Sequence, residues 1–326
     1  MRVLVTGATG FTGFALCKAL VERGDQVVAF VRSLKNADKL QHLGVECKVV
    51  DIKDAADVNK HFEKFDRVYH IAAAYRGEQV DRDEFRLVNV EAARNILDAA
   101  VANGVDRYVH CSTVGVQGEI ADPPADEDYR FSPHDHYQES KLEGELLARS
   151  YFDRGLIKGS VVRPTGLYGP GDMRFLKLFR GINRGYFFMI GSGKTLYHLT
   201  YIDDMVQGIL LAGEKEAAIG EVFTIGSTTN TTIREMVDTV ADILGKPHPK
   251  LRIPIFLMYI AAVLCDKVCR LFGVSPPLYP RRLDFFRVNR AFTIEKAQRL
   301  LGFHPQTELK QGLTKTSEWY KEHDLL

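Results

Sequence analysis

The chain has 326 residues, 45% of them hydrophobic and 26% charged, and its formal net charge is +1. This length can hold one large domain or two smaller ones with a sizeable core. A net charge near zero excludes a bulk electrostatic attraction to nucleic acid or to an anionic membrane. Five dispersed cysteines without a C-x-x-C pair indicate reduced thiols, and we expect neither a disulfide framework nor a metal site.

The first predicted elements are a strand at residues 3–5, a glycine turn at 6–13 and a helix at 14–22. Gly7 permits a tight turn, Gly10 lets a pyrophosphate approach the backbone, and Gly13 lets the helix pack close to the sheet. The free N–H groups and the dipole at the helix start favour phosphate. The combination predicts a dinucleotide site rather than a glycine-rich turn without a ligand.

The second predicted strand, at residues 26–31, ends at Arg32 and Ser33. An acidic residue at this position would bind the two ribose hydroxyls of NAD, whereas an arginine can accept the 2′-phosphate of NADP. Arg32 therefore favours NADP. NAD is the alternative if Arg32 is only a solvated charge at the strand end.

Three further strands are predicted at residues 45–50, 68–74 and 107–111, separated by helices at 55–65 and 85–103. Asp51 follows the first of them and either faces the adenine amino group or caps the next helix. The small side chains of Ala72, Ala73 and Ala74 suit the close passage of a ligand, whereas we interpret His70 as a packed histidine. Alternating strands and helices predict an α/β fold with a doubly wound parallel sheet.

A helix that opens at Tyr137 follows an acidic, proline-rich loop at residues 119–136. Tyr137 and Lys141 lie four residues apart and therefore share one helix face. The lysine ammonium can lower the pKa of the phenol, which can then exchange a proton with a carbonyl or alcohol oxygen. Ser112 and Thr113 follow the preceding strand at the sheet edge where ligands bind, which strengthens this interpretation.

The second half of the chain is less explicit. Helices are predicted at 173–186, 201–212, 233–245 and 313–322, and a strand at 221–225. The most apolar stretch is 253–273, whose uninterrupted run of about 13 residues is shorter than the roughly 20 that span a bilayer. We expect a buried helix there, with a helix lying along a membrane surface as the alternative.

Taken together, these features resemble the extended short-chain dehydrogenase/reductases, the NAD-dependent epimerase/dehydratase family. The motifs occur in the family's order: T-G-A-T-G-F-T-G (6–13), C-S-T-V-G-V-Q-G (111–118), Y-Q-E-S-K (137–141), R-P-T-G-L-Y-G-P-G-D (163–172) and Y-I-D-D (201–204). The resemblance covers essentially the whole chain. It implies a Rossmann-type parallel sheet in a dinucleotide-binding domain at 1–165, completed by 195–226. A smaller substrate-binding α/β region would then occupy 166–194 and 227–326.

By this resemblance Tyr137 is the general acid/base, Lys141 tunes it and binds the nicotinamide ribose, and Thr113 hydrogen-bonds the substrate oxygen. The expected substrate-binding residues are Tyr75, Thr113, Tyr168 and Arg281. The expected cofactor-binding residues are Gly7, Thr9, Gly10, Phe11, Gly13, Arg32, Asp51, Ile52, Ala72, Ala73, Ala74, Asn89, Ser112, Tyr137, Lys141, Pro164 and Thr165.

Two substrate classes compete. A nucleotide sugar, epimerised or dehydrated, ranks first, because R-x-x-D at 281–284 matches a pattern that holds the pyrophosphate in sugar-nucleotide members of the family. Against it, Tyr197 and His198 stand where the family usually has an arginine. The alternative is a steroid or another ketone, because residues 196–212 and 253–273 resemble the 3β-hydroxysteroid dehydrogenase branch. Arg32 also suits a net reductase that uses NADPH.

A small molecule is therefore the expected partner. The intact set of Thr113, Tyr137 and Lys141 argues against a regulator that binds cofactor without turnover. The resemblance also implies a homodimer, because this family commonly pairs through two helices on one side of the sheet. Because the first predicted strand begins within the first three residues, we expect no signal or transit peptide and a cytoplasmic location. No membrane span is expected, and a peripheral membrane contact stays open.

Overall fold

A seven-stranded parallel sheet forms the centre of the molecule in a computed structural model that describes residues 1–75 and 82–326. The strand order is β11-β6-β5-β4-β1-β2-β3. The strands are β1 (Arg2–Thr6), β2 (Gln26–Val31), β3 (Glu46–Val49), β4 (Arg67–His70), β5 (Arg107–Cys111), β6 (Gly159–Pro164) and β11 (Val222–Ile225). Every neighbouring pair is parallel, which confirms the predicted doubly wound sheet.

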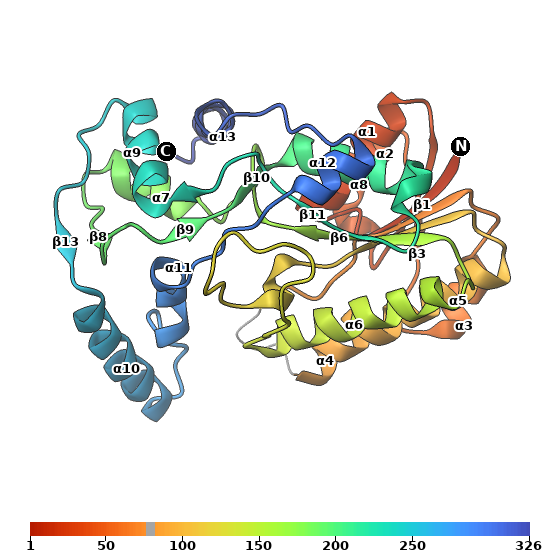
Figure 1. The fold of residues 1–326 in the computed structure, drawn as a ribbon, viewed down its shortest axis with the longest axis horizontal. Coiled ribbons are helices and arrows are strands. Elements are labelled where there is room, and N and C mark those ends of the chain that lie inside the picture. The colour runs from red at the N-terminus through yellow and green to blue at the C-terminus, as the bar shows by residue number, and fades with distance from the viewer. Residues whose placement is uncertain (76–81) are drawn as a thin grey trace.

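Helices cover both faces of this sheet, as Figure 1 shows. One layer holds α1 (Phe11–Glu22), α2 (Asp38–His42), α8 (Ile202–Glu214) and α12 (Glu295–Leu301). The other holds α3 (Ala55–His61), α5 (Ala92–Ala102) and α6 (His136–Asp153). Leu16, Ile209 and Leu301 pack in the core of the first layer. Ile96 and Ala148 pack in the core of the second, so the strands are buried on both sides and are apolar along most of their length.

The predicted helix at 85–103 is interrupted by a wider turn. It consists of α4 (Arg82–Arg86), the π-helical turn η2 (Leu87–Glu91) and α5. Asn89 lies in this turn, and its backbone carbonyl faces Gly144 of α6, where an added Cβ would overlap the carbonyl oxygen. A π-turn often marks a functional site, and here it brings two helices into backbone contact.

A second core lies beside the sheet and belongs to the region expected to bind substrate. It is built from α7 (Leu176–Asn183), α9 (Ile233–Leu244) and α13 (Leu309–Glu322), which contribute Phe179, Val237 and Leu313. Three small sheets join it: β7 (Gly166–Tyr168) with β10 (Leu199–Tyr201), β9 (Leu196–Tyr197) with β12 (Thr231–Thr232), and β8 (Met189–Ile190) with β13 (Arg252–Ile253). The short helical segments elsewhere are η1 (Leu34–Asn36), η3 (Val114–Gln117), η4 (Glu216–Ala218), η5 (Pro280–Leu283) and α11 (Asp284–Arg287).

The helix predicted at 173–186 is shorter at both ends, spanning only α7. The Asp172 carboxylate accepts hydrogen bonds from the backbone N–H and the guanidinium of Arg174, which holds residues 172–174 in a turn. At the other end Gly185 has a φ of +74°, which no right-handed helix can continue through. The predicted helix at 233–245 is confirmed, because a capping box between Thr232 and Glu235 fixes its start.

The burial expected for residues 253–273 is wrong. They form α10 (Ile255–Leu271), which projects from the body of the protein (Figure 1). Ala262 is its one buried residue, whereas Leu264 is 58% exposed and Leu271 is 82% exposed. The apolar run predicts burial only if another element covers it, and none of the described elements covers its outer side. No helix among residues 1–75 and 82–326 is long and apolar enough to cross a membrane.

The fold predicts where a ligand binds. β1 lies between β2 and β4, so the chain runs outward from β1 first in one direction and then in the other. In open α/β sheets, ligands bind at such a switch point, beyond the carboxyl ends of the strands. The segments that follow β1, β2, β4, β5 and β6 should therefore supply the site.

The close approach at Gly144 yields a stability prediction. We expect Gly144→Ala to lower the free energy of unfolding by about 2 kcal/mol, because the new methyl must displace backbone. Gly181→Ala in α7 is the matched control, since its Cβ would meet only ordinary contacts and alanine gains roughly 0.5–1 kcal/mol in a helix. Urea unfolding of both variants checks this. Equal effects of the two substitutions would contradict the claimed contact.

Candidate functional site

The glycine turn after β1 leaves the start of α1 open to a ligand. Gly7 has a φ of +72°, and a Cβ there would lie 2.6 Å from the backbone nitrogen of Ala72. A Cβ on Gly13 would overlap the Gly7 carbonyl oxygen. Gly10 is the N-cap of α1 and supplies no side-chain hydrogen bond to the helix. The N–H groups of the first turn therefore face outward with the positive end of the helix dipole, which suits a pyrophosphate.

Arg32 directly follows β2, at the same edge of the sheet as the glycine turn. Its side chain is exposed and, in the described part of the chain, forms no ion pair with an acidic residue. Ser33 caps η1 by accepting a hydrogen bond from the Lys35 N–H. The guanidinium is therefore not committed to an acid within the fold.

Asp51 is exposed just after β3, and its carboxylate accepts a hydrogen bond from the Lys53 N–H at 3.0 Å. The alternative that Asp51 caps the next helix is wrong, because Asp54 caps α3 by accepting from the Ala56 N–H. The backbone carbonyl of the neighbouring Ile52 accepts from the Asn95 side chain. Asp51 thus lies at the edge of the sheet where we expect the adenine amino group to bind.

The segment after β4 is tied to α6 by Asn89. The Ala74 N–H donates to Asn89 Oδ1 at 2.8 Å, and Asn89 Nδ2 donates to Ser140 Oγ at 2.8 Å. Asn89 is 1% exposed, so its side chain is engaged within the protein. It holds the passage formed by Ala72, Ala73 and Ala74 against the helix that carries Tyr137.

Tyr137 and Lys141 lie in the first turns of α6, whose N-cap is Asp135. Lys141 is 2% exposed, and its ammonium donates to the Cys111 carbonyl at 2.5 Å. Burial lowers the pKa of Lys141 below its ordinary value. Tyr137 is half-buried, and the rings of Tyr75 and Phe85 lie edge-on to it at centroid distances of 5.4 and 6.2 Å. The phenol is thus walled by aromatic rings, next to a desolvated ammonium on its own helix.

The two hydroxyls after β5 have different surroundings. Thr113 is half-buried and its Oγ1 accepts from the Gly115 N–H at 3.1 Å, which leaves its own proton to donate. Ser112 is buried and donates to Glu145 Oε2 at 2.6 Å. The side chain of Ser112 is therefore engaged with α6, whereas Thr113 keeps a hydroxyl free to act.

Glu145 also forms a fully buried ion pair with Arg163 of β6. Arg163 Nη2 lies 2.6 Å from Glu145 Oε1, and both side chains are 0% exposed. A further donor, Arg163 Nη1, reaches the Glu127 carbonyl at 2.8 Å. Such a pair stabilises the fold only when its remaining hydrogen-bonding capacity is satisfied, as Ser112 and Glu127 do here. It fixes α6 to β5 and β6 one turn beyond Lys141.

Pro164 and Thr165 lie at the end of β6, as expected, but face into the protein. Pro164 is paired with Ile225 of β11, and the Thr165 N–H donates to the Ile225 carbonyl at 3.1 Å. The Thr165 hydroxyl hydrogen-bonds that of Thr200, and Thr165 is 6% exposed. If Pro164 and Thr165 contact a cofactor, they can do so only through the few atoms that they expose to solvent.

The expected substrate residues are only partly brought together. Tyr75 is 46% exposed and touches Tyr137, as described. Tyr168 is 2% exposed, packs against Tyr201 and faces Gly312, so it belongs to the core and we do not retain it as a substrate contact. Arg281 pairs with Asp135, the N-cap of α6.

A cavity of about 270 Å³ opens beside this pair, between residues 118–138 and 281–290. Arg281, Arg287 and Arg290 line it, as do Asp135 and Asp284. Arg287 is paired with Asp284 at 3.1 Å. Cations and carboxylates thus line the same cavity, which reaches Asp135 and Gln138 at the start of α6.

Sequence reasoning missed Asp135, Phe85 and Arg174. Asp135 was detectable, because Asp135 and Gln138 stand at capping-box spacing and the Asp135 carboxylate accepts from the Gln138 N–H. Arg174 interacts with the Tyr75 hydroxyl, and its guanidinium lies over the Phe11 ring at 5.7 Å. No sequence signal marks such a contact, because it joins a turn near 174 to the glycine turn.

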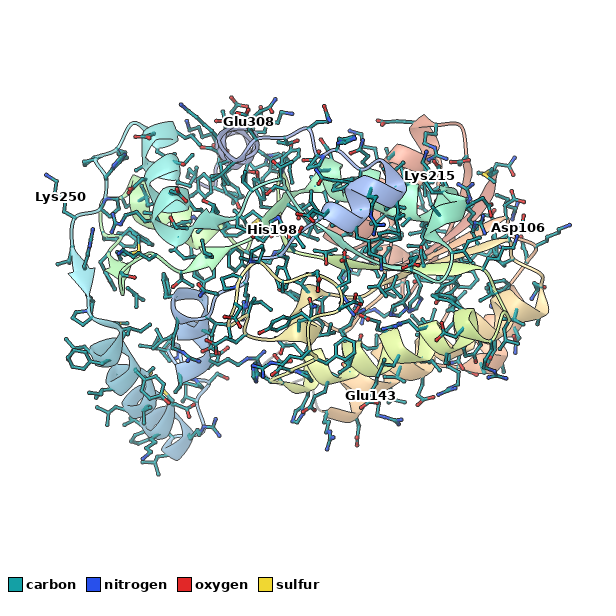
Figure 2. The ribbon with its side chains drawn as sticks, in the orientation of Figure 1. Asp106, Glu143, His198, Lys215, Lys250 and Glu308 are labelled. Atoms are coloured by element: carbon teal, nitrogen blue, oxygen red, sulfur yellow. The ribbon has the colours of Figure 1, made fainter. Side chains whose placement is uncertain are left out.

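Two labelled side chains contrast the outside of the molecule with its interior. Glu143 lies on the outer side of the helix, away from the sheet, whereas His198 lies in the interior (Figure 2). His198 is 2% exposed, and its Nε2 lies 2.8 Å from the Ser227 carbonyl. Burial lowers the pKa of His198 to about 4, so it is neutral near pH 7.

Fold and site together define a dinucleotide-dependent enzyme. An uncapped helix start follows a glycine turn at the switch point of a doubly wound sheet, and a Tyr/Lys pair lies on a helix beside that edge. The overlaps at Gly7 and Gly13 are with protein backbone, so these two glycines let the turn pack closely, whereas a Cβ on Gly10 would meet only the Gly7 carbonyl oxygen, which fits a pyrophosphate approaching the turn there. Residues 3–226 match the NAD dependent epimerase/dehydratase family, and the chain belongs to it. This confirms the resemblance to extended short-chain dehydrogenase/reductases and an NAD(P)-dependent enzyme.

Known relatives span nearly the whole chain. It is 31% identical to mouse short-chain dehydrogenase/reductase family 42E member 1, over 98% of this chain and 87% of the relative. It is 30% identical to a putative dihydroflavonol 4-reductase of Synechocystis sp., over 98% of this chain and 94% of the relative. The crystal structure of UDP-glucuronic acid 4-epimerase from Bacillus cereus in complex with NAD has a TM-score of 0.78, 26% identity and 99% coverage of both chains.

Two stacked histidines beneath Lys141 predict a pH dependence of stability. His70 and His110 are buried, with ring centroids 5.7 Å apart, and the expectation that His70 is packed is confirmed. Burial, followed by the Lys141 charge, lowers the pKa of His70 to about 3 and that of His110 well below its ordinary value. Because the unfolded chain binds these protons below about pH 6.5 and the folded chain does not, stability is retained above that pH and lost as the pH falls towards about 3.

We expect each buried histidine to remove up to about 1.4 kcal/mol of unfolding free energy per pH unit within this window. His110→Phe should reduce the slope of unfolding free energy against pH by the contribution of about one proton. His42→Phe, at an exposed site, should leave this slope unchanged. Urea unfolding between about pH 7 and pH 5 measures the slopes. Identical slopes for His110→Phe and the wild type would contradict the neutral, buried state.

Proposed function

We propose that the protein is an NADP(H)-dependent reductase of a small-molecule ketone, acting reversibly on the matching alcohol. The single observation that carries this choice is the pairing of Arg281 with Asp135. A pyrophosphate bound at Arg281 would have to share the guanidinium with the carboxylate that caps α6. A ketone makes no such demand on the site.

Arg32 supports NADP as the cofactor. It is exposed at the position where NAD-specific sites carry an acid, and it has no acidic partner among the described residues. A guanidinium is suited to a bidentate contact with a 2′-phosphate. Gly7 to Gly13 and the start of α1 would hold the pyrophosphate, and Asp51 and Ala72 to Ala74 would border the adenosine and its linkage.

The nicotinamide of such a cofactor supplies hydride transfer at the substrate carbon. Tyr137 would hold and deliver the proton at the substrate oxygen, and Thr113 would donate a hydrogen bond to that oxygen. Lys141 would keep a positive charge beneath the phenol, because the Cys111 carbonyl holds the ammonium in place. Tyr75 and Phe85 would exclude water from the phenol.

The pyrophosphate site expected in sugar-nucleotide enzymes finds little further support. His198 stands near the place of the usual arginine, and it is buried and neutral near pH 7. The neighbouring Tyr197 packs on Phe285 at 5.1 Å. Two relatives found by sequence carry the words reductase or dehydrogenase/reductase in their names, which agrees with net reduction.

Epimerisation of a nucleotide sugar, ranked first on sequence alone, is the second candidate. It is favoured by the cavity lined by Arg281, Arg287 and Arg290, which offers cations to an anion. The likeness to UDP-glucuronic acid 4-epimerase over the whole chain also supports it.

An assay of cofactor consumption tests the proposal. With a panel of steroid, aryl and alkyl ketones, we expect net oxidation of NADPH in preference to NADH, because Arg32 favours the 2′-phosphate. Tyr137→Phe should lower kcat/KM by about 10²-fold to 10⁴-fold while NADPH binding persists, because it removes the proton donor. Tyr186→Phe, at an exposed tyrosine after α7, is the control and should leave turnover unchanged.

Isomerisation of a UDP-sugar without net change in the cofactor would overturn the reductase proposal in favour of the second candidate. Full turnover by Tyr137→Phe would overturn the assignment of Tyr137 under either candidate.

A further inference from the structure

The outer side of α10 carries a cluster of exposed apolar side chains that none of the described elements covers. The inner side packs through Met258 and Ala262 onto Ile190 and Leu283. Six exposed apolar side chains point the other way: Phe256, Leu257, Ile260, Leu264, Val268 and Leu271. Leaving them in water is unfavourable, and contiguous apolar surfaces of this kind mark interaction sites.

These six side chains lie on one face of the helix. At about 100° per residue they fall within an arc of roughly 120°. Phe272 follows the helix at 77% exposure, about 40° beyond this arc. An apolar stripe of this width suits a flat, apolar phase along the whole helix.

The charge around α10 indicates which phase this is. Residues 246–290 contain nine Lys and Arg and only two Asp and Glu, a net charge of +7. The total for the chain is +1, so the remaining residues carry −6. The near-zero total, which had excluded attraction to an anionic membrane, hides a strong segregation of charge. Lys267 and Arg270 lie within and beside the apolar arc, and both are exposed.

We propose that α10 docks the protein on the surface of an anionic lipid bilayer, lying in the plane of the headgroups. Its apolar stripe enters the acyl boundary, and the long side chains of Lys267 and Arg270 reach back to the anionic headgroups. Asp266, the acidic residue of the helix, is paired with Arg270 at 3.0 Å. The helix lies in the surface and does not cross, because it is too short and too interrupted by charge to span.

A second copy of the chain fits this face less well. Pairing through α10 would bring two segments of net charge +7 together, and like charges oppose association. An anionic bilayer offers acyl chains to the apolar stripe and negative headgroups to the positive charge of residues 246–290.

Because α10 shares a core with Leu283 of η5, docking places the bilayer beside the segment that carries Arg281. The proposal itself does not depend on the assigned reaction.

Co-sedimentation of the full chain with vesicles tests this inference. We expect binding to vesicles of phosphatidylcholine with phosphatidylserine at least about tenfold stronger than to phosphatidylcholine alone, and weaker as salt is raised. Leu264→Glu combined with Leu271→Glu should reduce binding by about tenfold for each leucine, because each loses its place in the acyl boundary.

The matched control combines Leu34→Glu with Leu156→Glu, which makes the same changes at exposed leucines elsewhere. Circular dichroism confirms the fold of each variant. Loss confined to the α10 variant supports the inference. Absence of wild-type binding to anionic vesicles, or equal loss in both variants, overturns it. Self-association that the α10 variant abolishes, without vesicle binding, would assign the face to a second copy instead.

Discussion

The attachment of α6 to the carboxyl ends of β5 and β6 is the constraint on which the site depends. Glu145, one turn beyond Lys141 on α6, accepts a hydrogen bond from Ser112 and pairs with Arg163 of β6. Removing two charges from water is costly and succeeds only when every partner is in place. The network therefore tolerates one position of the helix, and that position sets Tyr137 beside Tyr75.

Two further contacts make the same helix a rigid support. Gly144 allows the backbone of η2 to approach α6, and Asn89 links Ser140 to the segment after β4. The border of the expected cofactor site and the expected acid/base are thus held by one set of buried hydrogen bonds. Preorganisation of this kind costs folding energy, but it removes reorganisation from the reaction. The helix α10, by contrast, packs against the protein along one side only, which leaves its other side available to a binding partner.

Much of the fold could be predicted from the sequence, because alternation of strands and helices determines a doubly wound sheet almost alone. The glycine turn was equally explicit, since each of its glycines answers a separate steric demand. The directions of individual side chains could not be predicted in this way. Ser112 and Thr113 are adjacent, so a strand end turns them to opposite faces, and only the position of Glu145 decides which hydroxyl is engaged. The exposure of α10 escaped prediction for a related reason: an apolar run shows that a side chain avoids water, but not what covers it.

The central claim is that the buried Lys141 ammonium serves the reaction and not the fold. Lys141→Met keeps the shape of the side chain and removes a charge that burial disfavours. The decisive measurement compares the free energy of unfolding and the rate of NADPH-dependent carbonyl reduction in this variant and the wild type. The account predicts unchanged or higher stability together with a loss of turnover of about a hundredfold or more. A variant that loses stability but keeps its turnover would contradict it.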